Sequence, residues 1–190
     1  MSNLDSDINK ISEHLSDKQK RFDAVMDSSR EMIREAGQII TLLHNNRAAD
    51  AKKRMAQLKK AVTATRRTDD DFRYHMMQAY QEYVEAACFF SIKTKGSIPR
   101  LSELGVDNEA YILGLMDCVG ELKREVFESL NDGDTKSANR YFGFMKLIYD
   151  STRSIRFAEV VLGGFRKKQD VARIQIESAG SEILSFKRVR

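Results

Sequence analysis

The amino-acid sequence predicts an all-α protein, a single domain of about six to seven packed helices that begins with one long helix. Three observations support this prediction. The chain of 190 residues has only one proline and ten glycines, so it is poor in residues that break helices. Charged residues make up 32% of it, and its apolar residues recur at helical spacing. Because a chain of this length with 42% hydrophobic residues can bury one substantial core, residues 1–190 are expected to form one domain.

The first helix is expected to begin at Leu4 and to end near Asn45-Asn46. Its apolar side chains alternate between four- and three-residue spacing for roughly forty residues, which is typical of a helix that packs left-handedly against neighbours. Lys18 and Ser29 interrupt this heptad pattern. The apolar positions are Leu4, Ile8, Ile11, Leu15, Phe22, Val25, Met32, Ala36, Ile39 and Leu43.

Further helices are expected at about 48–67, 69–93, 107–131 and 134–157, with a last one from about residue 165. Residues that start or stop helices set these boundaries. Thr68–Asp71 resembles a capping box, and Asp107 is expected to cap the helix that follows it. Gly133-Asp134 combines a glycine stop with an aspartate start, and Gly163-Gly164 mark the last break.

Charge and cysteine content restrict the function classes only weakly. The formal net charge of +4 and the pI near 9.0 permit a polyanionic partner without requiring one. Cys88 and Cys118 lie in helical patterns, so we expect small buried side chains in a reducing compartment rather than a disulfide. No apolar run is long enough to span a bilayer, and Met1–Asp5 lacks the features of a signal peptide. We therefore expect a cytoplasmic protein that does not contact a membrane.

The expected helix at 107–131 carries two acidic residues one turn apart, Asp117 and Glu121. Like charges at this spacing repel and cost a few tenths of a kcal/mol, so the pair needs an explanation. A solvent-exposed polar face is the common one, since charged side chains are mostly exposed. However, Gly114 and Gly120 lie beside the pair, and each costs roughly 1 kcal/mol in a helix relative to alanine. These glycines predict that another part of the chain approaches closely there.

The expected helix at 69–93 carries a second acidic pair, Glu82 and Glu85. If the two helices pack antiparallel across the short connection between them, the pairs face each other at mid-height. Four converging carboxylates need a cation, and Mg²⁺ or Mn²⁺ suits carboxylate and water ligands. Such a site predicts hydrolysis of a phosphate ester. Neither pair continues as Glu-x-x-His, which disfavours a di-iron centre.

Histidines and basic clusters are weaker candidates for function. His75 lies on the same expected polar ridge as Glu82 and can bind a phosphate or carry a proton, although a partly exposed structural histidine is more common. His14 and His44 look like helix-surface and helix-end residues without a partner. Basic residues cluster at 52–54, 66–67, 166–168 and 187–190, and a surface that follows phosphates would be built from such residues.

Four segments, in order and with fitting separations, resemble the translin family. They are Glu82-Tyr-Val-Glu85-Ala, Tyr111-Ile-Leu-Gly-Leu-Met-Asp117-Cys-Val-Gly-Glu121-Leu-Lys-Arg124, Asn131-Asp-Gly-Asp134 and Phe165-Arg-Lys-Lys-Gln-Asp170-Val-Ala-Arg173. The similarity covers the chain from about Asp17 onward. It is closest to the branch that resembles translin-associated factor X, because this branch keeps the acidic residues.

This resemblance implies a Mg²⁺-dependent endoribonuclease that acts on single-stranded RNA, with Mn²⁺ as a substitute. Glu82, Glu85, Asp117 and Glu121 would then be both the metal ligands and the catalytic residues. The resemblance also implies a hollow homo-oligomer, roughly an octamer, with this face turned inward. Translin itself binds single-stranded DNA and RNA through a basic stretch that aligns near residues 72–75. The candidates for contact with nucleic acid are Arg66, Arg67, Arg73, His75 and Arg124.

Two alternatives remain at this point. One is a non-catalytic shell that binds single-stranded RNA or DNA, in which the carboxylates are structural. The other is a helical nucleoside triphosphate pyrophosphohydrolase, which also uses Glu-x-x-Glu on one helix and acidic residues on the next. The order of Asp117 before Glu121 and the residues around them count against this second alternative.

Overall fold

The computed structural model describes residues 3–66 and 70–189, and over these ranges the chain is helical, with no β-strand. The predicted all-α fold is confirmed. Two elements are short: η1, a 3₁₀ helix at Asp70–Met76, and α4 at Leu101–Leu104. The longer helices are α1 (Asn3–His44), α2 (Ala48–Thr65), α3 (Met77–Lys95), α5 (Asn108–Asn131), α6 (Thr135–Thr152) and α7 (Phe165–Val189).

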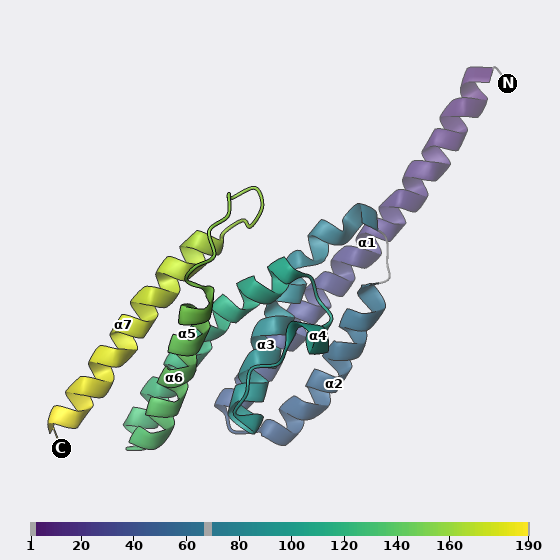
Figure 1. The fold of residues 1–190 in the computed structure, drawn as a ribbon. Helices are drawn as coiled ribbons and strands as arrows, with labels where there is room; N and C mark the ends of the chain where they lie inside the picture. Colours follow the sequence, from purple (N-terminus) through teal and green to yellow (C-terminus); the bar gives the residue numbers. More distant parts are fainter. Residues whose placement is uncertain (1–2, 67–69, 190) are drawn as a thin grey trace.

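The helices form two groups that meet where α3 packs against α5 (Figure 1). On one side, α1 packs against α2 and α3; on the other, α5 packs against α6 and α7. The direct contact between α3 and α5 joins the groups and lies at the centre of the molecule. The N-terminal part of α1 projects beyond the other helices, and the C-terminus lies at the opposite end (Figure 1).

Gly114 of α5 explains how α3 and α5 approach so closely. A Cβ atom at Gly114 would lie 2.5 Å from the backbone oxygen of Gln81 and 2.7 Å from Cβ of Val84. Contacts this short do not occur between real side chains, so only glycine fits here. The close approach predicted from the glycines is therefore found at Gly114, and it brings the backbones of the two acidic helices together.

The heptad stripe of α1 is buried along only half of its length. Met32, Ala36, Ile39 and Leu43 are almost fully buried in the core. Leu4, Ile8, Ile11 and Leu15 each expose more than half of their surface. The prediction of one long helix is confirmed, but its first part extends past α2 and α3 (Figure 1).

Several predicted helix ends differ from the structure. The helix expected from residue 69 begins as η1 and becomes α-helical only at Met77, since 3₁₀ turns often open helices. The helix expected to reach Phe157 ends at Thr152. Asp107 does not cap α5 through its side chain, because that carboxylate pairs with Arg73 instead. The capping box expected at Thr68–Asp71 lies largely outside the described residues.

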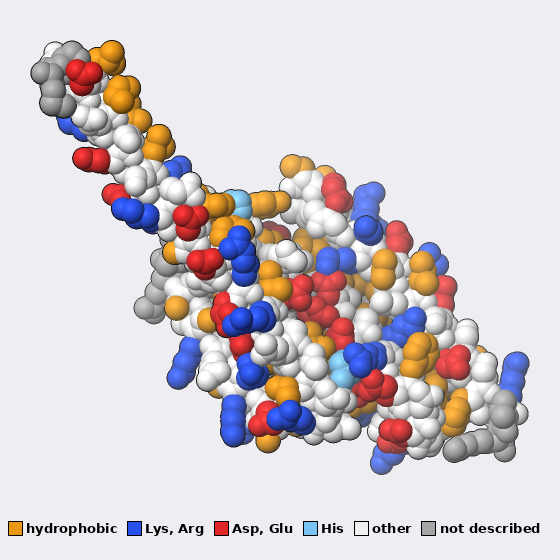
Figure 2. Space-filling view, turned by 180° about the vertical axis from the view of Figure 1, so that it is seen from behind, with side chains coloured by type: hydrophobic (Ala, Val, Ile, Leu, Met, Phe, Trp, Pro, Cys, Tyr) orange, Lys and Arg blue, Asp and Glu red, His pale blue; other side chains and the backbone are white. Residues whose placement is uncertain are grey.

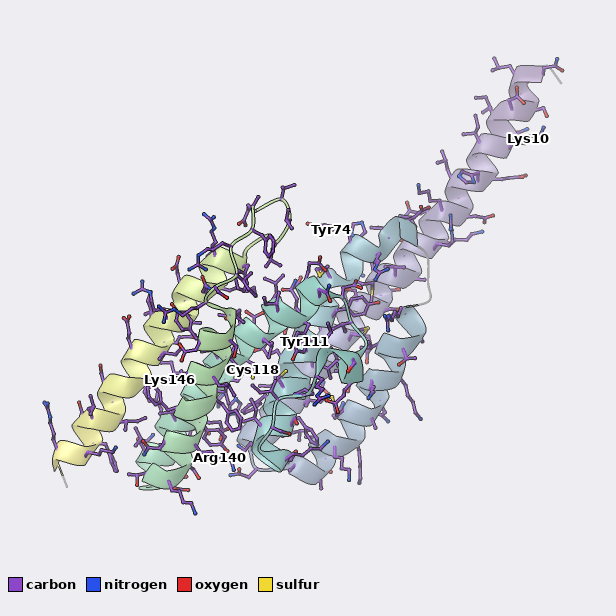
Figure 3. The ribbon with its side chains drawn as sticks, viewed as in Figure 1. Lys10, Tyr74, Tyr111, Cys118, Arg140 and Lys146 are labelled. Carbon is purple, nitrogen blue, oxygen red and sulfur yellow. The ribbon has the colours of Figure 1, made fainter. Side chains whose placement is uncertain are left out.

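Other local predictions are confirmed. The carboxylate of Asp134 accepts a hydrogen bond from the backbone nitrogen of Ser137 at 2.9 Å and so caps α6. Cys88 and Cys118 are buried free thiols, and Figure 3 shows Cys118 within the helix packing, between the labelled Tyr111 and Arg140. None of the described helices combines the length and the hydropathy that crossing a membrane requires.

Candidate metal and nucleic-acid site

Three of the four predicted metal ligands line one open cavity. Glu82 and Glu85 come from α3 and Asp117 from α5, and the cavity has a volume of about 550 Å³. Another wall of the cavity is formed by side chains of α7, namely Lys167, Lys168, Val171 and Gln175. Figure 2 shows acidic side chains gathered near the middle of one face of the molecule, with basic side chains around them.

The charges of the four acidic residues act on one another across the two helices. Burial raises the pKa of Glu85 to about 8, with further contributions from Asp117, Glu82 and Glu121. The pKa of Glu82 is also raised, first by burial and then by Asp117 and Glu121. The structure therefore brings the acidic pairs of α3 and α5 together, but the antiparallel packing expected from the short connection is wrong. Gly114 lies against Gln81 and Val84, and further along both helices Glu125 contacts Lys93, so α3 and α5 run in the same direction. Buried carboxylates that also repel one another favour a bound cation.

Lys168 of α7 supplies positive charge to this site. Its Nζ atom lies 2.5 Å from each carboxylate oxygen of Asp117. Its charge also lowers the pKa of Glu82 and Glu85, against the larger effect of burial. Lys168 was not predicted as a site residue, although the basic cluster at 166–168 was the signal that could have identified it.

Glu121 is held by a histidine from α1. The Nε2 atom of His44 lies 2.5 Å from Oε2 of Glu121, and its Nδ1 atom lies 2.8 Å from Oε1 of Glu125. Lys93 of α3 donates to the same Oε1 of Glu125 at 2.7 Å. His44 ends α1 as predicted, but the prediction that it has no partner is wrong. It failed because its partners lie on α5, far away in the sequence.

The donor set fits a hard divalent cation in chemistry, but the side chains are not arranged as a closed set of ligands. Among the described residues, three potential ligand atoms within 4.8 Å of one another occur at His44, Glu125 and Glu128, and not among the four predicted carboxylates. Lys168 and His44 explain this arrangement, since they hold Asp117 and Glu121. A cation at the predicted site would have to displace the ammonium of Lys168 from Asp117.

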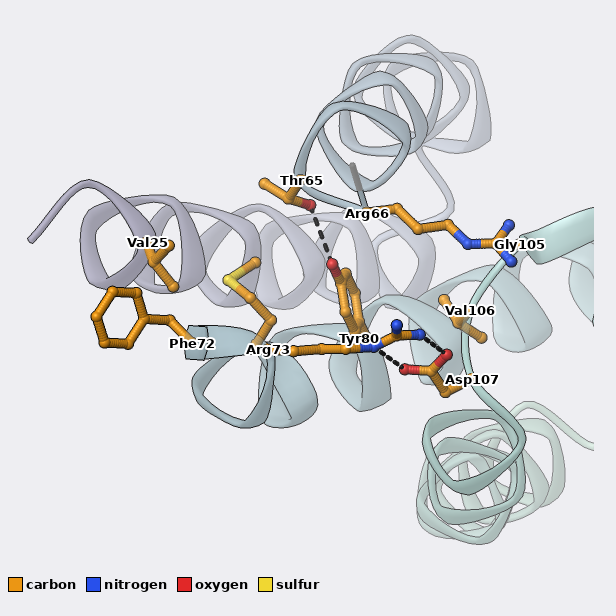
Figure 4. Close-up of a pocket in the computed structure, with 10 residues that line it drawn as sticks. Val25, Thr65, Arg66, Phe72, Arg73, Tyr80, Gly105, Val106 and Asp107 are labelled. Atoms are coloured by element: carbon orange, nitrogen blue, oxygen red, sulfur yellow. Dashed lines mark hydrogen bonds and ion pairs between the residues drawn. The ribbon is translucent and has the colours of Figure 1, made fainter. Parts of the chain in front are cut away.

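Arg66 and Arg73 lie together at a small cavity of about 10 Å³, separate from the acidic cavity (Figure 4). The Nε atom of Arg73 donates to Asp107 at 3.0 Å, and a second nitrogen of its guanidinium also pairs with that carboxylate. Arg66 extends towards Gly105, where a Cβ atom would lie 3.3 Å from its Nη1 atom (Figure 4). Arg67, predicted with them, lies outside the described residues.

The other two predicted nucleic-acid contacts lie elsewhere. His75 belongs to η1, and its exposed ring packs edge-on against Phe22 of α1, with 5.2 Å between the ring centroids. Arg124 is exposed on α5 and pairs with Glu128 at 2.9 Å. Arg66 and Arg73 thus share a cavity that His75 and Arg124 do not line, while Lys167 and Lys168 are the basic residues that line the acidic cavity.

Comparisons with known proteins agree with this fold. A family model described as "Translin family" matches residues 4–179. An uncharacterized protein of Methanocaldococcus jannaschii is 29% identical over 184 residues, which cover 95% of this chain and 82% of that protein.

Solved structures give the same result. A structure described as AfC3PO in complex with duplex RNA superposes with a TM-score of 0.85 at 28% identity, covering 96% of this chain and 97% of that chain. A crystal structure of AfC3PO has a TM-score of 0.84 at 28% identity, covering 96% and 98%. The crystal structure of apo-NeC3PO shares the fold with a TM-score of 0.85 at 22% identity, covering 98% of each chain.

Proposed function

Since the chain belongs to the translin family, we propose that it is a Mg²⁺-dependent endoribonuclease that cuts single-stranded RNA inside a hollow homo-oligomer. Within the family we assign it to the branch that resembles translin-associated factor X. The observation that carries the proposal is that Glu82, Glu85 and Asp117 line one cavity, where burial, with the charges of Asp117, Glu82 and Glu121, raises the pKa of Glu85 to about 8. Mn²⁺ is expected to substitute for Mg²⁺.

The side chains at the acidic cavity have separate roles in this proposal. The four carboxylates of α3 and α5 hold the cation. A divalent cation held there supplies Lewis-acid activation of a phosphodiester and of the attacking water. Lys167 and Lys168 line the same cavity and attract the phosphate backbone by charge. The Lys168 ammonium, which pairs with Asp117 here, would be free to contact a phosphate oxygen if Asp117 were engaged by a cation.

RNA is the substrate class that the comparisons favour. AfC3PO, which is 28% identical to this chain, has been solved in complex with duplex RNA. We propose single-stranded RNA as the form that is cut and single-stranded DNA as a further ligand. An octamer of identical chains is the assembly expected from the resemblance, with the acidic cavity on the inside.

The test is cleavage of an end-labelled single-stranded RNA, measured beside its own duplex and a single-stranded DNA of the same sequence, with Mg²⁺ and with EDTA. We expect Mg²⁺-dependent cutting of the single strand, and we expect Glu82→Gln and Asp117→Asn to lower it by roughly 100-fold, as loss of a group that stabilises transition-state charge does. Glu109→Gln is the control, because Glu109 is exposed in the first turn of α5.

The outcomes separate the alternatives. Equal cleavage by the unaltered protein and both site variants would contradict the catalytic proposal. Binding of RNA without cleavage under every metal condition would favour the non-catalytic shell. Release of pyrophosphate from free nucleoside triphosphates, with no cutting of RNA, would favour the pyrophosphohydrolase alternative.

A further inference from the structure

His44 is a buried histidine with both ring nitrogens engaged. It ends α1, its side chain is only 3% exposed, and its ring packs against Phe89 of α3 with 4.8 Å between the ring centroids. Nε2 contacts Glu121 at 2.5 Å and Nδ1 contacts Glu125 at 2.8 Å. Because both ring nitrogens and the ring itself are in contact with other side chains, the imidazole of His44 is held in one orientation.

The contacts of His44 form a chain of alternating charges that ties three helices together. Lys93 of α3 pairs with Glu125 of α5, Glu125 with His44 of α1, and His44 with Glu121 of α5. Burial lowers the pKa of His44, but the hydrogen bonds with Glu121 and Glu125 outweigh it and raise that pKa above 6.5. A charged imidazole donates from both nitrogens, so it can serve the two carboxylates at once.

Glu121 differs from the other acidic residues of the site in how it is held. Asp117 gives both of its oxygens to Lys168. The bond from His44 engages Oε2 of Glu121, so a cation would have to bind Oε1. A glutamate that is fixed at one oxygen has already lost much of its rotamer freedom, so binding at the other oxygen costs less entropy.

We infer that His44 is a positioning residue that orients Glu121 towards the cation of the acidic site. The inference rests on the proposed function, because Glu121 needs this orientation only if it binds the cation. His44 touches neither substrate nor metal in this role and acts through Glu121 alone. Outer partners of this kind typically contribute 10- to 100-fold, roughly, to metal affinity or activity.

Two amide variants separate the two bonds of His44. In His44→Gln the amide nitrogen reaches roughly the place of Nε2 and can still donate to Glu121. In His44→Asn it reaches roughly the place of Nδ1 and can donate only to Glu125. Both variants replace a buried imidazole by an amide of similar polarity, so each is the control for the other. The measurements are Mn²⁺ affinity by isothermal titration calorimetry and, separately, kcat and KM for RNA.

We expect His44→Gln to bind Mn²⁺ within about threefold of the unaltered protein, and His44→Asn to lose roughly 10-fold or more. The loss should appear in Mn²⁺ affinity and kcat, with KM for RNA little changed. Equal affinities in the two variants would overturn the role of His44. Absence of Mn²⁺ binding by the unaltered protein would instead overturn the proposed function, and this inference with it.

A second measurement does not require a substitution of His44, so it does not depend on whether such a variant folds. The chain has three histidines, so their ¹⁵N ring signals can be followed while Mg²⁺ is added. We expect the Nε2 signal of His44 to move as Mg²⁺ saturates the site and to stay still in Glu82→Gln, while the signals of His14 and His75 do not respond. A Nε2 signal of His44 that ignores saturating Mg²⁺ would contradict the inference.

Discussion

The Nζ atom of Lys168 lies 2.5 Å from both carboxylate oxygens of Asp117. This ion pair connects α7 to the acidic cavity between α3 and α5. Both side chains are about 30% exposed, so the pair is reachable from solvent. The ammonium would therefore compete with the proposed divalent cation for Asp117.

Removing this competition should strengthen metal binding. Lys168→Met is expected to raise Mn²⁺ affinity severalfold, because Asp117 is released and a positive charge near the cation is lost. Lys167→Met is the matched control, since Lys167 lines the same cavity but is exposed. Isothermal titration calorimetry of both variants measures the effect. Unchanged or weaker Mn²⁺ binding by Lys168→Met would argue against a cation at Asp117.

Glu85 should make the metal-free protein less stable as the pH rises. Its carboxyl has a pKa of about 8 in the folded protein and 4.5 in the unfolded chain. Between these values the folded state keeps a proton that the unfolded chain releases, so the free energy of unfolding falls as the pH rises from 4.5 towards 8. Glutamine at position 85 cannot ionise, so the Glu85→Gln variant should not lose stability in this way as the pH rises.

Glu85→Gln should therefore raise the melting temperature at about pH 8.5 in EDTA, with a gain that shrinks steadily towards about pH 5. The measurement is thermal unfolding followed by circular dichroism across this pH range, with Glu109→Gln as the control. Saturating Mn²⁺ should stabilise the unaltered protein more than Glu85→Gln. A gain that is the same at every pH would show that ionisation of Glu85 is not its cause.

Gly114 should be essential for the packing of α3 against α5. Gly114→Ala places a Cβ atom 2.5 Å from the backbone oxygen of Gln81, so the helices must separate. We expect a loss of about 1–3 kcal/mol in the free energy of unfolding, measured by denaturant titration. Gly143→Ala on α6 is the control: its Cβ atom meets nothing within 4 Å, so it should stabilise the protein by roughly 0.5–1 kcal/mol. Equal changes in the free energy of unfolding for the two variants would contradict the close approach of α3 and α5 at Gly114.

The exposed half of the α1 heptad stripe should take part in the proposed homo-oligomer. Ile8 and Ile11 are 55% and 53% exposed on the projecting part of α1, and apolar heptad positions normally pack against another helix. Ile8→Asp with Ile11→Asp should lower the oligomer mass measured by light scattering after gel filtration. Asn9→Asp with Ser16→Asp adds the same charge at exposed positions outside the stripe and should not. Identical oligomer masses for the two double variants would show that the exposed stripe of α1 takes no part in assembly.

The sequence predicted the parts of this structure that depend on local patterns. Helical spacing predicted the long α1, and Gly133-Asp134 predicted the start of α6, because both signals lie within a few residues of the feature. Gly114 predicted a close approach, since only a steric demand justifies its cost in a helix.

The side-chain partners of the acidic residues could not be predicted in this way. Lys168 and Asp117 are 51 residues apart, and His44 and Glu121 are 77 residues apart. A pair at such separation has no periodic signal, because its contact depends on how whole helices pack. For the same reason the partners of the predicted basic residues could not be predicted: Arg73 pairs with Asp107 and Arg124 with Glu128.

A crystal structure with Mn²⁺ bound, read from the anomalous signal of the metal, shows directly whether the acidic residues of α3 and α5 hold a cation. We expect a peak between α3 and α5, within coordination distance of carboxylates from both acidic pairs, with Lys168 moved away from Asp117. A peak at His44, Glu125 and Glu128 instead, or no peak in a protein that cuts RNA with Mn²⁺ in solution, would contradict it.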